Sequence, residues 1–114
     1  MRKEISKLVR DNVPAIISKD TSVEKFSYHQ CNNKVELIEA LLNKVIEEAT
    51  ELKNSHIDTN ISLDEFVDVL EVVDRLKQEL PWTSDEIEEA RAKKAKEKGA
   101  FDIAYVLDEI TYKE

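Results

Sequence analysis

The chain holds one glycine and two prolines in 114 residues, so few positions can interrupt a long helix. Pro14 suits the first turn of a short helix that runs towards Lys19. Pro81 and Gly99 each follow a helical pattern, at a place where a helix can end. The same scarcity excludes glycine-rich phosphate loops and the dinucleotide-binding fingerprint. If this chain binds a nucleotide, side chains and metal ions must hold it.

Apolar residues recur with helical spacing between these breaks. In the second long segment they place one apolar face towards the expected core: Leu63, Phe66, Leu70, Val73 and Leu76. The spacing predicts one helix over about 33–53 and a second over about 62–80, the latter opened by a Ser-x-x-Glu capping box at Ser62. A third helix is expected to begin at Thr83 or Ser84, with acidic residues first and lysines last, and to end at Gly99. That order of charges matches the helix dipole.

Two other segments have a different pattern. Residues 21–30 alternate weakly, and residues 101–107 form an apolar run, so we expect two short strands that can pair. Residues 54–62 are polar and predict a loop. The predicted fold class is mainly α, a helical bundle to which a short two-stranded β element can be added.

Composition limits the class of protein. The length and the 41% hydrophobic content predict a single domain over residues 1–114 with one core. A net charge of −8 argues against a nucleic-acid partner, because such binding needs clustered cations. No run reaches the roughly 20 apolar residues of a membrane span, and the N-terminus lacks the apolar stretch of a signal peptide. With a lone cysteine, Cys31, no intrachain disulfide can form, and we expect a cytoplasmic protein with no membrane partner.

Pairs of acids on the two long helices are the strongest functional signal. Glu48 and Glu51 are three residues apart, and so are Glu65 and Asp68, which makes each pair neighbours on a helix surface. On a helical wheel both pairs flank an apolar stripe, with Glu48 about 60° from Val45. If the two stripes pack antiparallel, four carboxylates converge.

Four converging carboxylates would repel one another by several kcal/mol at an effective dielectric constant of about 20. Divalent cations relieve that repulsion, and oxygen ligands without histidine or cysteine favour Mg²⁺ or Mn²⁺. Two alternatives stay open on spacing alone. The first is that these acids are ordinary surface residues, because acidic pairs are common on solvated helices. The second is that Glu71 and Asp74, which repeat the same spacing, bind the metal instead.

Several blocks of the chain resemble one family. The pattern Glu48-x-x-Glu51, then Glu65-x-x-Asp68, resembles the metal-binding signature of the MazG-like all-α nucleoside triphosphate pyrophosphohydrolases. Residues 7–14, Lys-Leu-Val-Arg-Asp-Asn-Val-Pro, look like the opening of its short branch, the phosphoribosyl-ATP pyrophosphohydrolase-like proteins. The stretches 64–73 and 93–101 look like two further motifs of that branch, so the likeness covers most of residues 7–107.

The resemblance implies a reaction and a set of roles. The reaction is hydrolysis of a nucleoside triphosphate, of a non-standard or surplus kind, to monophosphate and pyrophosphate. The implied metal ligands are Glu48, Glu51, Glu65 and Asp68, which decides against Glu71 and Asp74, and the implied cofactor is Mg²⁺, with Mn²⁺ as substitute. Glu47 is implied to orient the attacking water or a second metal, and the implied phosphate contacts are Lys44, Arg10, Lys94 and Lys98. Lys98 and Ala100 depart from the Arg and second Gly of the family motif.

Two other functions remain as alternatives. The same chemistry would serve phosphoribosyl-ATP in histidine biosynthesis, and an acidic helical module without catalysis would bind a partner protein instead. The expected partners are a nucleotide substrate and further copies of the chain. The apolar stripes are wide for one helix pair, so a homo-oligomer is expected to complete the bundle.

Overall fold

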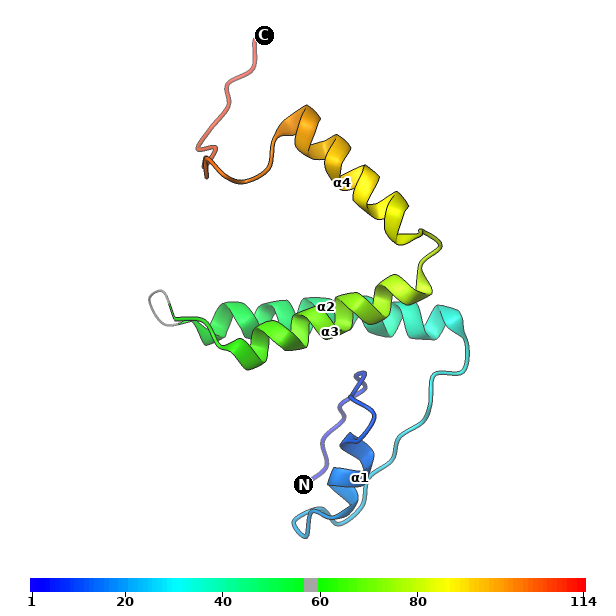
Figure 1. Cartoon of the computed structure of the whole chain (residues 1–114). Helices are drawn as coiled ribbons and strands as arrows, with labels where there is room; N and C mark the ends of the chain where they lie inside the picture. The colour runs from blue at the N-terminus through cyan, green and yellow to red at the C-terminus, as the bar shows by residue number, and fades with distance from the viewer. Residues whose placement is uncertain (57–59) are drawn as a thin grey trace. The chain divides into compact units, whose positions relative to one another are not determined.

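The computed structural model describes residues 1–56 and 60–114. It contains four helices: α1 (Val13–Ser18), α2 (Lys34–Ser55), α3 (Leu63–Glu79) and α4 (Ser84–Lys98) (Figure 1). The prediction of a mainly α fold is confirmed, and each helix lies within about two residues of its expected position. In the described part of the chain, no helix is both long and apolar enough to cross a bilayer.

The two expected strands are not present. Residues 21–30 and 101–107 form no strand, so the β element of the prediction is wrong. A lone pair of short strands is marginal in water without a third strand or a packed face. Within this segment the rings of Phe26 and Tyr28 stack on one another, with centroids 5.7 Å apart. The loop predicted over 54–62 includes residues 57–59, which lie outside the described residues.

The chain divides into two compact units, Met1–Pro81 and Trp82–Glu114. The first unit holds α1, α2 and α3, and the second holds α4 and the C-terminal tail. The expectation of a single domain over residues 1–114 stays a prediction, and each unit is described by itself.

Side chains at the helix starts explain where the helices begin. Asn33 accepts a hydrogen bond from the Glu36 backbone at 2.9 Å to cap α2, and the Ser62 hydroxyl accepts one from the Glu65 backbone at 3.3 Å to cap α3. The reciprocal pair that defines a capping box occurs at α4, where Thr83 and Glu86 exchange both bonds. These bonds satisfy backbone N–H groups that have no partner within the helix.

Gly99 ends α4 as expected. Its φ of 82° lies in the left-handed region that disfavours a side chain, and its N–H donates to the Ala95 carbonyl at 2.8 Å. Asp85 and Glu86 lie in the first turn of α4, and Lys96 and Lys98 lie in the last. The charges at each end are opposite in sign to the partial charge of the helix dipole there, so they stabilise α4.

Helices α2 and α3 lie side by side and form the one packed helix pair of the described chain (Figure 1). Leu41 of α2 is the single fully buried hydrophobic side chain among the described residues, at 1% exposure. Val45 of α2 and Val72 and Leu76 of α3 are half-buried. The enclosed apolar core of this pair is therefore small.

The rotation of α3 differs from the expectation. The residues expected to face the core are Leu63, Phe66, Leu70, Val73 and Leu76. The first four are 38–72% exposed, and only Leu76 is half-buried. The side of α3 that carries Glu65 and Asp68 lies towards α2 instead. The carboxylates thus lie in the helix–helix interface, and part of the apolar stripe is left on the surface.

Candidate metal centre

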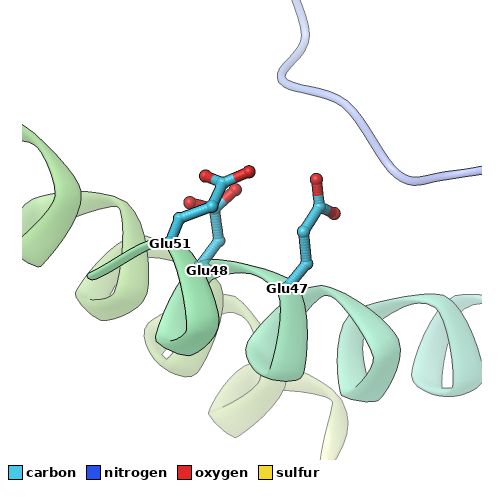
Figure 2. A group of neighbouring side chains, drawn as sticks. All are labelled: Glu47, Glu48 and Glu51. Carbon is cyan, nitrogen blue, oxygen red and sulfur yellow. The ribbon is translucent and has the colours of Figure 1, made fainter. Parts of the chain in front are cut away.

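Five acidic residues form two clusters that share one member. Glu47, Glu48 and Glu51 make the α2 cluster, named for the single helix that carries all three (Figure 2). Glu48 also joins Glu65 and Asp68 of α3 in a second group, the interhelical cluster. In each cluster, one carboxylate oxygen from every residue lies within 4.8 Å of the others. The structure therefore brings together all four expected metal ligands and Glu47.

Glu48 is the one residue common to both clusters and is 6% exposed. Its Oε1 accepts from Lys44 Nζ at 3.1 Å, but its Oε2 is buried with no hydrogen-bond partner in the structure. Glu65 Oε2 is also buried and has no hydrogen-bond partner in the structure. A buried oxygen without a partner costs about 1–3 kcal/mol, and more when it carries charge. Both unpartnered oxygens belong to residues of the interhelical cluster.

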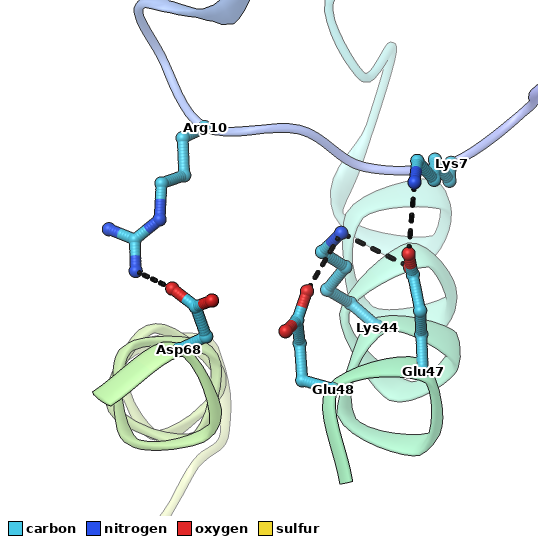
Figure 3. Close-up of polar contacts among 6 residues, drawn as sticks. All are labelled: Lys7, Arg10, Lys44, Glu47, Glu48 and Asp68. Carbon is cyan, nitrogen blue, oxygen red and sulfur yellow. Dashed lines mark hydrogen bonds and ion pairs between the residues drawn. The ribbon is translucent and has the colours of Figure 1, made fainter. Parts of the chain in front are cut away.

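The α2 cluster contains its own counter-charges. Lys44 Nζ lies 3.1 Å from both Glu47 Oε2 and Glu48 Oε1, and Lys7 Nζ lies 3.1 Å from Glu47 Oε1 (Figure 3). Desolvation opposes the charge on Glu47, but the bonds from Lys7 and Lys44 outweigh it and lower the pKa of this carboxyl. Desolvation likewise opposes the charge on Lys44, yet its two carboxylate partners raise its pKa. Both groups are thus held in their charged forms.

The pKa of Glu51 shifts in the opposite direction to that of Glu47. Partial desolvation, followed by the negative charge of Glu48, raises the pKa of Glu51 above its usual value. Glu47 and Glu65 add smaller repulsions of the same sign. A cation placed among these groups would remove the repulsion.

Arg10 approaches the interhelical cluster from the N-terminal segment. Its guanidinium donates to Asp68 Oδ1 at 2.7 Å (Figure 3). This bond, together with the charges of Asp68, Glu71 and Glu48, raises the pKa of Arg10. Arg10 was expected near the site, whereas the contact of Lys7 with Glu47 was not. The four bases among residues 1–11 were the signal that could have pointed to Lys7.

Some expected or rival residues lie elsewhere. Glu71 and Asp74 are exposed and belong to neither cluster of the described residues, in keeping with the choice of Glu65 and Asp68. Lys94 and Lys98 are exposed on α4, which belongs to the second unit and is described by itself. Their role as phosphate contacts stays a prediction.

Comparison of the chain with family models, with curated proteins and with solved structures found no match. The likeness to the MazG-like superfamily therefore stays a prediction, and the site must be judged on its own chemistry. Its donors are carboxylate oxygens on two packed helices, with no histidine or cysteine in either cluster. Such a donor set fits Mg²⁺ or Mn²⁺ and does not favour zinc or copper.

Proposed function

We propose that the chain is a Mg²⁺-dependent nucleotide pyrophosphohydrolase. The observation that carries the proposal is the pair of buried, unpartnered oxygens on Glu48 and Glu65, which belong to one carboxylate cluster built from two helices. Hydrophobic packing gives no reason to bury two like charges together. A divalent cation supplies one, because it would partner both oxygens at once. The resemblance of the sequence motifs supports the choice of a nucleotide as substrate.

The proposed reaction joins water to the α-phosphorus of a nucleoside triphosphate. The new bond links the water oxygen to this phosphorus, and the bond to the oxygen that bridges the α- and β-phosphates breaks. The products are the monophosphate and pyrophosphate, and the proton that the attacking water loses passes to the solvent. Bound Mg²⁺ would supply charge neutralisation at the phosphates and acidify water.

The chain's own residues divide the remaining tasks. Glu48, Glu51, Glu65 and Asp68 would hold the metal. Glu47 carries a lowered pKa and two lysine partners, so it suits the orientation of a water molecule better than the uptake of its proton. Lys44 would balance charge at the phosphates, and Lys94 and Lys98 remain proposed phosphate contacts. We place the activity in the cytoplasm, where nucleoside triphosphates are abundant.

The test is pyrophosphate release from a panel of nucleotides with Mg²⁺, with phosphoribosyl-ATP as a separate member. We expect release from at least one nucleotide, and loss of release in Glu48→Gln. Asp74→Asn is the matched control, because Asp74 is an exposed acid of α3 outside both clusters. Absence of release from every nucleotide, or full activity in Glu48→Gln, would refute the proposal and favour a non-catalytic acidic module. Release from phosphoribosyl-ATP alone would identify the histidine-pathway substrate.

We also propose that a second copy of the chain covers the exposed apolar surface of α2 and α3. This surface, the outer apolar face, comprises Val35, Leu42, Ile46, Leu63, Phe66, Leu70 and Val73. A monomer rarely leaves so many large apolar residues on neighbouring helices uncovered. A second α2–α3 pair has the matching length and composition to complete a four-helix arrangement.

Sedimentation equilibrium tests this association. We expect a dimer or a higher oligomer for the wild type, and a monomer for Phe66→Asp, which places a charge in the outer apolar face. A wild type that stays monomeric at every concentration would contradict the proposal. Ile16→Asp, on the exposed part of α1, is the control and is expected to associate as the wild type does.

A further inference from the structure

Two cations of the N-terminal segment contact carboxylates on two different helices. Lys7 pairs with Glu47 of α2, and Arg10 pairs with Asp68 of α3 (Figure 3). In an extended chain, residues three apart are separated by roughly 10 Å, so the two bases reach separate parts of the site. One contact is made in each cluster.

Both contacts are open to water and are replaceable. The side chains of Lys7 and Arg10 are 46% and 57% exposed, and pairs of this kind contribute about 0–1 kcal/mol. The segment that carries them has no helix or strand before α1 begins at Val13. Leu8 is half-buried, and the other residues from Met1 to Asn12 are exposed. Little packing holds these ten or so residues against α2 and α3.

The same carboxylates are the groups that a divalent cation would use. Asp68 belongs to the interhelical cluster and Glu47 to the α2 cluster. A metal ion at either cluster therefore competes with the base already paired there. Once the metal has neutralised the carboxylates, Lys7 and Arg10 lose their attraction to them and remain beside the site with unpaired positive charge.

We propose that Lys7 and Arg10 form a cationic clamp that exchanges partners during the reaction. In the metal-free protein the clamp binds Glu47 and Asp68, and with metal bound it binds the phosphate oxygens of the substrate. This inference rests on the proposed metal-dependent function and adds a recognition element for the polyphosphate group. The planar guanidinium of Arg10 can donate two parallel bonds to one phosphate, which Lys7 cannot.

The exchange has a signature that a merely structural role lacks. Removing the two positive charges relieves the competition and strengthens metal binding, but it weakens binding of the polyphosphate. A segment that only supported the fold would, when damaged, weaken both. The opposite signs separate the two roles.

The experiment uses the full chain and two probes. Binding of Mn²⁺ alone is measured from the paramagnetic resonance signal of the free ion, and binding of inorganic tripolyphosphate is measured by calorimetry at saturating Mn²⁺. Tripolyphosphate carries the phosphate chemistry of every nucleoside triphosphate, so the result does not depend on the base. The variant is Lys7→Gln with Arg10→Gln. The control is Arg2→Gln with Lys3→Gln, which removes the same charge from the same segment, outside both clusters.

We expect the clamp variant to bind Mn²⁺ roughly threefold more tightly or better, as the loss of two exposed ion pairs implies. We expect it to bind tripolyphosphate roughly tenfold more weakly, because charge-assisted bonds are lost. The control is expected to change both constants by less than about twofold, because exposed charges at a distance are screened. Arg10→Lys alone keeps the positive charge but loses the planar guanidinium. It should therefore leave the Mn²⁺ affinity near the wild-type value and lower the affinity for tripolyphosphate.

The outcomes separate this proposal from the proposed function. If the wild type binds Mn²⁺ and the clamp variant binds it with the same affinity, the clamp proposal is overturned, but the proposed metal site is still supported. Weaker binding of both Mn²⁺ and tripolyphosphate by the clamp variant also overturns the clamp proposal. Wild type that binds no Mn²⁺ overturns both proposals. A measurement on the wild type alone adds a check that needs no variant to fold: Mn²⁺ should speed tryptic cleavage after Lys7 and Arg10, and unchanged cleavage counts against the clamp.

Discussion

The two acidic clusters share Glu48 but differ in how their charges are balanced. The α2 cluster lies on one helix and is paired with Lys44 and Lys7. The interhelical cluster needs α2 and α3 together, and it contains the buried, unpartnered oxygens of Glu48 and Glu65. Both clusters have basic partners, since Arg10 pairs with Asp68, but only the interhelical cluster has a second residue, Glu65, with a buried oxygen that lacks a partner.

This difference predicts which cluster depends more on metal. Carboxylates that already have lysine partners gain less from a divalent ion than carboxylates whose buried oxygens have none. The interhelical cluster should therefore account for most of the increase in unfolding free energy that metal binding produces, and the α2 cluster should account for less. Four substitutions test this ranking, each measured by urea unfolding with and without Mg²⁺.

Leu41→Ala has the largest expected effect on the fold. Leu41 of α2 is fully buried, and truncation of such a side chain to alanine costs about 2–5 kcal/mol. Loss of packing should also reduce metal binding at the interhelical cluster, which requires both helices, more than at the α2 cluster. Ile16→Ala, at an exposed position of α1, is the control and should change the unfolding free energy by less than about 0.5 kcal/mol. Equal effects of the two substitutions would show that the α2–α3 interface carries no special stability.

Glu48→Gln should remove most of the stabilisation that Mg²⁺ provides. An ion at 100 times its dissociation constant stabilises the native state by about 2.7 kcal/mol. The loss of the shared ligand affects both clusters, so we expect little Mg²⁺-dependent shift to remain. A shift of wild-type size in this variant would place the metal elsewhere in the chain. Asp74→Asn should keep the full shift.

Glu65→Gln should change stability in opposite directions with and without metal. Removing a buried charge that lies beside Glu48 and Asp68 should stabilise the metal-free protein by about 1 kcal/mol. The same change removes a ligand and should reduce the Mg²⁺-dependent shift strongly. Destabilisation of the metal-free protein would mean that the Glu65 carboxylate has a partner in solution.

Glu51→Gln has the smallest expected effect. Glu51 is an exposed member of the α2 cluster, where the lysines already supply positive charge. The Mg²⁺-dependent shift should fall by less than it does in Glu65→Gln. A larger fall in Glu51→Gln would reverse the ranking of the two clusters.

Local signals in the sequence account for the helices. Ser62 and Thr83 cap α3 and α4 through atoms three residues away, and Gly99 ends α4 through its own backbone. Interactions of this range are visible in the order of residues. The two expected strands failed for a related reason: alternation over a few residues does not supply the partner strands that a sheet requires.

The rotation of α3 and the clamp contacts depend on long-range packing. Apolar periodicity predicted Phe66 and Leu70 to face the core, but the side with Glu65 faces α2. Periodicity identifies an apolar stripe without stating which neighbour covers it. The pair formed by Lys7 and Glu47 joins residues forty positions apart, and no local pattern encodes such a contact. Spacing alone brought the four acids together as candidates, and the resemblance chose them over Glu71 and Asp74.

The position of Glu48 in both clusters links two potential cation sites through one side chain. An ion held by one carboxylate oxygen of Glu48 draws electron density and fixes the rotamer that the other site also uses. The affinities of the two sites are then not independent, and a titration with metal would follow a coupled curve, not the sum of two separate ones. A substitution at Glu48 changes both affinities, whereas Glu47, Glu51, Glu65 and Asp68 each belong to one cluster and allow one site to be altered without direct loss of a ligand from the other.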